Sequence, residues 1–227
     1  MPKTHSKRYR EAAGKVPAGK LRVAEAVKAL KSLPATKFDA TVDVVMHLGV
    51  DPKQPDQALR GAVSLPHGIG VAKKVIAFCD GEDVARAKAA GAIEAGGDDL
   101  IKKITDGWMD FDVAVTTPTM MRSVSKLGRI LGPQGKMPSP KSGTVVTDIP
   151  KAVTEYSAGK VEFRTDDGGN IHAPVGKVSF EEGKLAENVE AFIGHIKRLR
   201  PATAKGTYII KVCISTSMSP SIALEVE

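Results

Sequence analysis

The hydrophobic pattern of this chain changes its period twice, and this double change constrains the fold more than any other feature. Residues 41–50 and 160–179 alternate apolar and polar side chains, which is typical of half-buried strands, and the turn residues 166–170 predict that the second stretch is a hairpin. Residues 74–156, between them, show short apolar runs separated by helical patterns, including an expected helix over 119–131 and an expected strand over 144–146. A pattern that stops and then resumes predicts a domain interrupted by an insertion. We therefore expect a discontinuous outer domain, residues 1–66 with 160–227, and an inserted domain, residues 67–159.

The two patterns predict different fold classes for the two domains. In the outer domain, the alternating strands are accompanied by amphipathic helical patterns over residues 22–33 and 181–199. This combination is typical of an α+β layer, in which helices cover one face of an antiparallel sheet. In the inserted domain, the runs Val75–Cys79 and Asp112–Thr116 are mostly apolar and alternate with helices. Strands buried on both faces predict a parallel sheet, so we expect a small α/β domain.

The charge of the chain is positive and unevenly distributed. The 227 residues have a formal net charge of +7, and residues 1–66 contain 12 Lys and Arg against 6 Asp and Glu. Such an excess favours a polyanionic partner, either nucleic acid or an anionic membrane surface, but a soluble protein with a charged tail has the same composition. Residues 2–20 form a basic arm with a short helix expected over 6–14. This arm either lies on phosphate or is solvated.

Features of secreted and membrane proteins are absent from the sequence. No apolar run approaches the roughly 20 residues that span a bilayer, and residues 1–20 lack the apolar core of a signal peptide. Cys79 and Cys213 have no Cys or His at ligand spacing, which predicts buried free thiols in a reducing compartment. We therefore expect a cytoplasmic protein with no membrane partner.

The sequence contains no motif that supports catalysis. Gly68-Ile69-Gly70 begins like a dinucleotide-binding turn, but Lys73 stands where the third glycine belongs. The segment 132–136 resembles half of a phosphate-binding loop, but Met137 replaces the Ser or Thr that such a loop requires. The five His residues are isolated. We expect no enzyme activity, cofactor, metal or small-molecule substrate; the alternative is a nucleotide-binding enzyme of the α/β class.

The loop Gly128–Gly143 is the least ordinary segment of the inserted domain. It is rich in Gly and Pro, contains no acidic residue, and includes Arg129, Lys136 and Lys141. Rigid turns expose backbone N–H groups and the cations add charge, so the loop could contact RNA phosphates. The other interpretation is a long ordered crossover loop.

Three segments of the outer domain combine hydroxyl side chains with a cation or an apolar residue. They are residues 36–41, 164–177 and 215–221, and they include Phe38 and Met218. RNA is recognised through its shallow minor groove, its 2′-hydroxyls and bases stacked on flat or apolar side chains. Together the segments favour RNA over the DNA major groove, which usually takes a helix. For each segment alone, ordinary turn chemistry is the favoured explanation.

Several stretches resemble the family of large ribosomal subunit protein one. They are residues 37–44, 48–61, 65–70, 107–112, 127–145, 160–180 and 216–221, which follow the family order over nearly the whole chain. The resemblance implies an outer domain that binds large-subunit rRNA and an inserted Rossmann-like domain joined to it by two chain crossings. It also implies a monomer in the mobile lateral stalk of the cytoplasmic ribosome. Exit-site tRNA, whose release it assists, and its own operon mRNA, whose translation it represses, are the further partners implied.

The resemblance also assigns roles to residues. The RNA-binding residues it implies are Lys37, Phe38, Thr41, Arg164, His172, Lys177, Thr216, Ser217 and Met218. The crossings imply a hinge at Pro66, His67, Gly68 and Gly159, where glycine can absorb a dihedral change. The sequence departs from the family at Ser219, where glycine is usual, and at Gln134, where arginine is usual. A glycine needed for positive φ would make Ser219 costly by about 1 kcal/mol.

Overall fold

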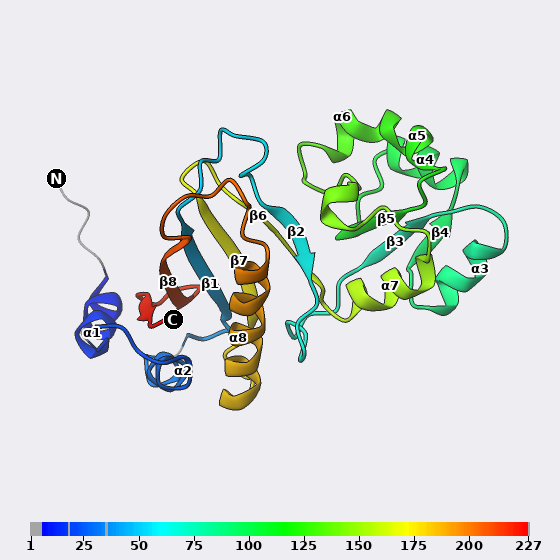
Figure 1. Ribbon diagram of the computed structural model, residues 1–227. Helices are drawn as coiled ribbons and strands as arrows, with labels where there is room; N and C mark the ends of the chain where they lie inside the picture. Colours follow the sequence, from blue (N-terminus) through cyan, green and yellow to red (C-terminus); the bar gives the residue numbers. More distant parts are fainter. Residues whose placement is uncertain (1–5, 18, 35, 227) are drawn as a thin grey trace. The chain divides into compact units, whose positions relative to one another are not determined.

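The structure is a computed structural model that describes residues 6–17, 19–34 and 36–226. The chain forms two compact units (Figure 1). Unit 1 contains residues 1–70 and 161–227, and unit 2 contains residues 71–160. Unit 1 is an antiparallel sheet with helices, and unit 2 is built on a parallel sheet, so the fold class predicted from the sequence is confirmed. The chain first passes from unit 1 to unit 2 after Gly70, four residues later than the boundary expected after residue 66.

Unit 1 is organised around its central strand, β1 (Thr41–Leu48). The four-stranded sheet has the order β7-β1-β8-β9, and β1 is antiparallel to both neighbours, β7 (Asn170–Lys177) and β8 (Ile209–Thr216). Every second residue of β1 is buried, which fits the period of two in its sequence. The short strand β9 (Ile222–Leu224) completes the sheet beside β8.

One apolar core holds the sheet of unit 1 to its helices. The helices are α1 (Lys7–Lys15), α2 (Val23–Lys31) and α8 (Glu182–Arg198). Leu30 of α2 and Phe192 of α8 join Val44 and Met46 of β1 in this core. Burying side chains of this size stabilises the fold by roughly 1.5–3 kcal/mol each. The sheet is therefore fixed from one face, and its outward-facing residues remain available for a partner.

The expected hairpin over residues 160–179 divides between two sheets. Strand β6 (Val161–Arg164) pairs with β2 (Arg60–Val63) in a separate antiparallel ribbon, while β7 joins the main sheet. The bridge between Thr165 and Ile171 connects the two arms of the turn, together with a hydrogen bond from the Asp166 N–H to the Asn170 carbonyl at 2.8 Å. Phe163 directs its ring onto Phe192 of α8, with centroids 5.9 Å apart, and this packing directs β6 toward α8. Periodicity had indicated the strands but not their partners.

Asn188 of α8 fastens the end of the first crossing to unit 1. Its amide is fully buried, and its Oδ1 accepts a hydrogen bond from the backbone N–H of His67 at 3.1 Å. Its Nδ2 donates to the carbonyl oxygens of Gly68 at 2.9 Å and Val175 at 2.8 Å. Residues 67 and 68 are therefore an ordered part of unit 1, and the crossing itself lies beyond Gly70.

Unit 2 is a three-layer α/β structure. Its parallel sheet has the order β4-β3-β5, formed by β3 (Val75–Phe78), β4 (Glu94–Gly96) and β5 (Val113–Thr116). Alternate residues of β3 enter two different cores. Val75 and Ala77 pack with α3 (Glu82–Ala89) and α7 (Ile149–Ser157), while Ile76 and Phe78 pack with α4 (Asp98–Thr105) and the segment that follows β5. The strand is apolar throughout because both of its faces are buried.

Two elements expected in unit 2 differ from the structure. The helix expected over residues 119–131 is divided into α5 (Met121–Val124), the 3₁₀ turn η1 (Ser125–Leu127) and α6 (Gly128–Leu131). The strand expected over 144–146 is reduced to one bridge between Thr116 and Val145. The 3₁₀ turn η2 (Pro140–Ser142) precedes it. Cys79 is buried as expected, whereas Cys213 of unit 1 is only half-buried.

Candidate nucleic-acid interface

Three segments far apart in the sequence meet at the first residue of β1. Lys177, the last residue of β7, donates from Nζ to Thr41 Oγ1 at 2.8 Å. The backbone N–H of Thr41 donates to Ser217 Oγ at 3.3 Å, and the N–H of Ser217 donates to the Thr41 carbonyl at 3.2 Å. The sheet register thus joins residues that the sequence singled out separately. We call residues Phe38, Thr41, Lys177, Thr216, Ser217 and Met218 the Thr41 cluster.

The turn that follows β8 presents the side chain of Met218. The N–H of Ser219 donates to the Thr216 carbonyl at 3.2 Å, and Ser219 Oγ accepts from the Thr216 N–H at 2.9 Å. Ser219 Oγ also donates to the carbonyl of Pro220 at 3.0 Å. This closed turn leaves Met218 53% exposed, although a thioether of this size is more often buried. An exposed apolar side chain on a fixed turn suits packing against a sugar or a base.

Serine at position 219 is compatible with this turn. None of the described residues other than glycine has a positive φ, so Ser219 is free of the left-handed strain that a glycine would relieve. Its hydroxyl makes two hydrogen bonds that a glycine could not make. The departure from the family pattern therefore leaves the shape of the turn intact.

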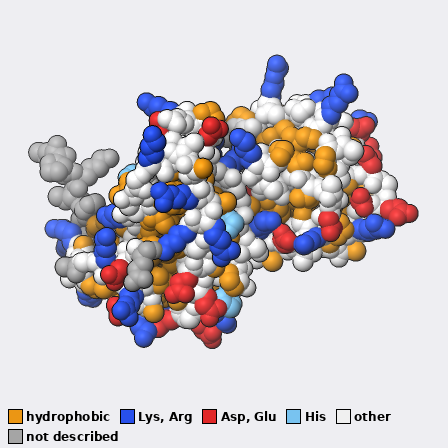
Figure 2. All heavy atoms as spheres, in the orientation of Figure 1, with side chains coloured by type: hydrophobic (Ala, Val, Ile, Leu, Met, Phe, Trp, Pro, Cys, Tyr) orange, Lys and Arg blue, Asp and Glu red, His pale blue; other side chains and the backbone are white. Residues whose placement is uncertain are grey.

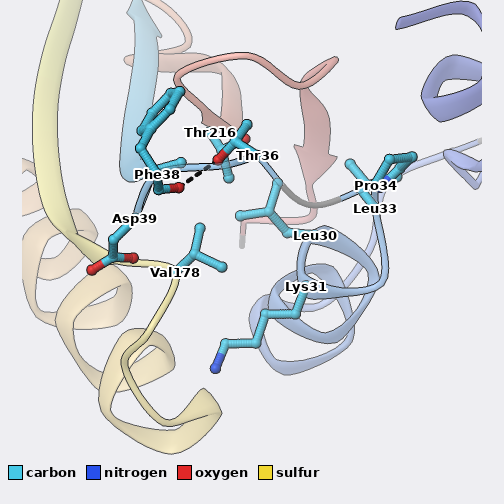
Figure 3. Close-up of a pocket in the computed structure, with 10 residues that line it drawn as sticks. Leu30, Lys31, Leu33, Pro34, Thr36, Phe38, Asp39, Val178 and Thr216 are labelled. Carbon is cyan, nitrogen blue, oxygen red and sulfur yellow. Dashed lines mark hydrogen bonds between the residues drawn. The ribbon is translucent and has the colours of Figure 1, made fainter. Parts of the chain in front are cut away.

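Phe38 precedes strand β1 by three residues and, like Met218, is 53% exposed. Thr36 Oγ1 donates to the Phe38 carbonyl at 2.6 Å, which holds the segment before β1 in place. Figure 3 shows the pocket beside this segment, lined by Leu30 of α2, by Val178, which follows β7, and by Thr216. Lys37, next to Phe38, is exposed. The segment therefore offers a flat ring and a cation beside the Thr41 cluster.

His172 lies further along β7, opposite Val45 of β1, and is exposed. Its Nε2 is 3.4 Å from Asp166 Oδ2. The backbone N–H and the side-chain amide of Asn170 donate hydrogen bonds to Asp166, and these lower the pKa of its carboxyl group to about 2. Hydrogen bonds from Gly168 and His172 contribute less to this lowering. Partial burial raises the pKa of Asp43 on β1, and the charges of His172 and Lys177 oppose this. The ammonium of Lys177 therefore also faces one half-buried carboxylate of the sheet.

Arg164 is separate from the Thr41 cluster. It ends strand β6 in the two-stranded ribbon and lies directly opposite Arg60 of β2, and both side chains are exposed. Like charges in a cross-strand pair are destabilising unless a counter-charge lies between them. Arg60 was not predicted from the sequence, because its pairing with Arg164 is visible only in the register of the two strands. The ribbon thus carries two exposed guanidinium groups at directly paired positions.

The cations of the loop in unit 2 fall into two groups. Arg129 on α6 and Lys141 in η2 are exposed. Lys136 instead donates to the carbonyl of Met109 at 3.2 Å, and its Nζ lies 5.0 Å from the centroid of the Phe111 ring. The ammonium of Lys136 is thus engaged within unit 2, and Arg129 and Lys141 are more accessible to a partner.

The surface of unit 1 fits a polyanion better than a small molecule. Figure 2 shows Lys and Arg side chains spread over the visible face of unit 1, with apolar side chains between them. Within the described part of the chain, no group of three or more His, Cys, Asp or Glu could hold a metal ion. Across the same residues, no helix combines the length and the apolar character that a bilayer crossing requires.

Comparison with known proteins decides the family. The model of the "Ribosomal protein L1p/L10e family" matches residues 28–220. The chain belongs to this family. It is 52% identical over 226 residues to "Large ribosomal subunit protein uL1" of Lactobacillus acidophilus, an alignment that covers 99% of this chain and 98% of that protein. The protein of the same name from Lactobacillus gasseri is 52% identical over 222 residues, covering 97% of this chain and 96% of that protein.

Family membership confirms the resemblance found in the sequence. The protein is a structural, non-enzymatic component of the large ribosomal subunit, and it is located with the cytoplasmic ribosome. Binding to large-subunit rRNA is implied by the family. The Thr41 cluster contains six of the nine RNA-binding residues predicted from the sequence, Lys37 adjoins it, and His172 and Arg164 lie outside it.

Proposed function

We propose that the protein grips large-subunit rRNA through the Thr41 cluster of unit 1. The proposal depends on one observation: Lys177 and Ser217 converge on Thr41, and the same cluster includes two exposed apolar side chains, Phe38 and Met218. Hydroxyls and one cation suit the ribose and phosphate groups of a folded RNA. Phe38 and Met218 suit a base or sugar that has left its stack.

Truncation of Met218 tests this proposal. Met218→Ala should weaken binding by roughly 1–3 kcal/mol if a base or sugar packs on the thioether. Filter binding with large-subunit rRNA of Lactobacillus acidophilus measures the affinity. Ile93→Ala is the matched control, because Ile93 is 49% exposed and lies in unit 2. Equal affinities for the two variants would remove Met218 from the interface.

The proposed role within the ribosome is to form the mobile lateral stalk. Unit 1 holds the rRNA as a rigid body, and unit 2 moves on the two chain crossings. His67 and Gly68 are anchored by Asn188, so we place the first flexing point after Gly70 rather than at residues 66–68. Gly159, which ends α7 with a φ of 99°, is the second. Measuring the distance between one label in each unit, in the free protein and in the protein bound to rRNA, tests this, and identical distances in both states would contradict it.

Assistance in the release of deacylated tRNA from the exit site is the second part of the proposal. The exposed pair Arg60 and Arg164 supports it, as do Arg129 and Lys141 in unit 2. None of these residues belongs to the Thr41 cluster, so they remain available when rRNA is bound there. Arg164→Gln should slow tRNA release from reconstituted ribosomes while leaving the affinity for isolated rRNA within twofold. Loss of rRNA affinity would place Arg164 in the rRNA site instead.

Repression of its own mRNA is the third part of the proposal. We place the operon mRNA on the Thr41 cluster as well, because both targets are folded RNA. The mRNA should then compete with rRNA for the protein, and Met218→Ala should weaken both complexes by a similar factor. Simultaneous binding of both RNAs to one protein molecule would overturn this.

A further inference from the structure

The N-terminal helix α1 contacts the turn that carries Met218. Arg8 of α1 lies with Nη2 3.2 Å from Met218 Sδ, although the two residues are 210 positions apart. Ala12, one turn further along the same face, is 4% exposed and belongs to the core of unit 1. Ser6 caps the helix by accepting a hydrogen bond from the N–H of Tyr9. The basic arm is therefore a docked element of unit 1 over residues 7–15.

The guanidinium of Arg8 keeps most of its donors for a partner. A guanidinium has five N–H donors, and a thioether is a weak acceptor. Among the described residues, no ion pair joins Arg8 to a carboxylate, whereas Lys15 of the same helix is paired with Glu11 at 2.9 Å. A half-buried guanidinium that points to an exposed apolar side chain is well placed to bind a phosphate in bidentate fashion.

We propose that Arg8 binds the phosphate of the nucleotide whose base or sugar packs on Met218, so that α1 is part of the RNA interface. The inference rests on the proposed rRNA grip and adds a contact that the sequence had not assigned. Met218 would then hold the apolar part of one nucleotide while Arg8 neutralises its charge. The turn over residues 216–219 orients the thioether, and the packing of Ala12 orients the guanidinium.

Helix α1 provides its own matched control. Arg10 is exposed, carries the same charge and lies two residues further on, which turns it by about 200° around the helix axis. A contact with the Met218 turn should involve Arg8 and not Arg10, whereas general attraction to RNA should involve both. Arg8→Lys separates charge from shape, because lysine keeps the charge but cannot bind a phosphate in bidentate fashion.

The experiment measures binding of the full chain to large-subunit rRNA of Lactobacillus acidophilus as a function of salt concentration. Arg8→Gln should lower the affinity about tenfold, as expected for the loss of a charge-assisted hydrogen bond. It should also reduce the slope of log K against log[salt] by about 0.7–0.9, the value for one phosphate contact. Arg10→Gln should change the affinity less than threefold, and Arg8→Lys should keep the slope while losing part of the affinity. Melting curves check that each variant is folded.

The outcomes separate this inference from the proposal beneath it. A tenfold loss confined to Arg8→Gln supports the phosphate contact. Equal losses for Arg8→Gln and Arg10→Gln overturn it, because the arm then acts only by its net charge. Unchanged binding for Arg8→Gln together with a loss for Met218→Ala also overturns it, but leaves the rRNA grip in place. If neither substitution weakens binding, the grip itself is wrong.

Discussion

The amide of Asn188 offers the sharpest test of how unit 1 is put together. Asn188→Ala removes three hydrogen bonds at once: one from the N–H of His67, and two to the carbonyls of Gly68 and Val175. The bond to Val175 is buried, whereas the other two are partly accessible to water. A buried group left without a partner costs about 1–3 kcal/mol and a partly solvated one about 1 kcal/mol.

The expected loss of stability is therefore about 3–5 kcal/mol, out of the 5–15 kcal/mol that a typical domain has. This lowers the melting temperature of unit 1 by roughly 9–25 °C, at about 3–5 °C per kcal/mol for a unit of this size. Differential scanning calorimetry suits a protein with two units, because it resolves separate transitions. Only the transition of unit 1 should move, since Asn188 and all three of its partners belong to that unit.

The control is Glu190→Ala, on the same helix and exposed, which should change stability by less than about 0.5 kcal/mol. A loss below about 1 kcal/mol for Asn188→Ala would show that water replaces the amide at this site. Equal shifts of both transitions would show that residues 67 and 68 couple the two units. Either result would refute the account of the first crossing given above.

Three further predictions concern the same unit. The pKa of Asp166 is about 2 in the folded protein, below the unfolded value of about 3.9. Its contribution to stability is therefore present above pH 4 and is lost as the pH falls toward 2, and Asp166→Ala should flatten the acid limb of a stability curve measured by urea unfolding. Gly70 has a φ of +74°, and an added Cβ would lie 2.7 Å from Phe180 Cε1. Gly70→Ala should thus destabilise unit 1 by about 2–4 kcal/mol in calorimetry, whereas Gly194→Ala, which has open space on α8, should stabilise it by up to about 1 kcal/mol.

The sequence predicts most of the fold because hydrophobic period depends on local chemistry. The period of two over residues 41–50 follows from one buried face of β1, and the apolar run of β3 follows from two buried faces. The pairing of strands depends instead on tertiary packing, so the sequence pattern could not predict it. The separation of β6 from β7 depends on Phe163 packing against α8. The break in the helix over 119–131 occurs where the chain passes through a 3₁₀ turn, next to Gly128.

The sequence predicted which kinds of residue form the candidate site, but it did not predict how these residues are arranged in space. Hydroxyls, cations and exposed apolar side chains in three segments were recognisable from the sequence, and the register of β1 with β7 and β8 brings them together. Arg8 and Arg60 were not recognised, because each acquires its meaning from a neighbour distant in sequence. Lys136 was assigned by its charge alone, and its hydrogen bond to Met109 depends on the folded loop.

The long sequence separation across β1 sets the order in which a newly made chain can fold. Thr41 and Ser217 are 176 positions apart, so the central strand waits for a partner that is synthesised long after it. The strands of unit 2 pair with near neighbours and can associate soon after they emerge. Unit 2 can therefore fold while unit 1 is still incomplete. The surface proposed to hold RNA therefore forms later than unit 2, because it is complete only once residues 209–217 have been synthesised.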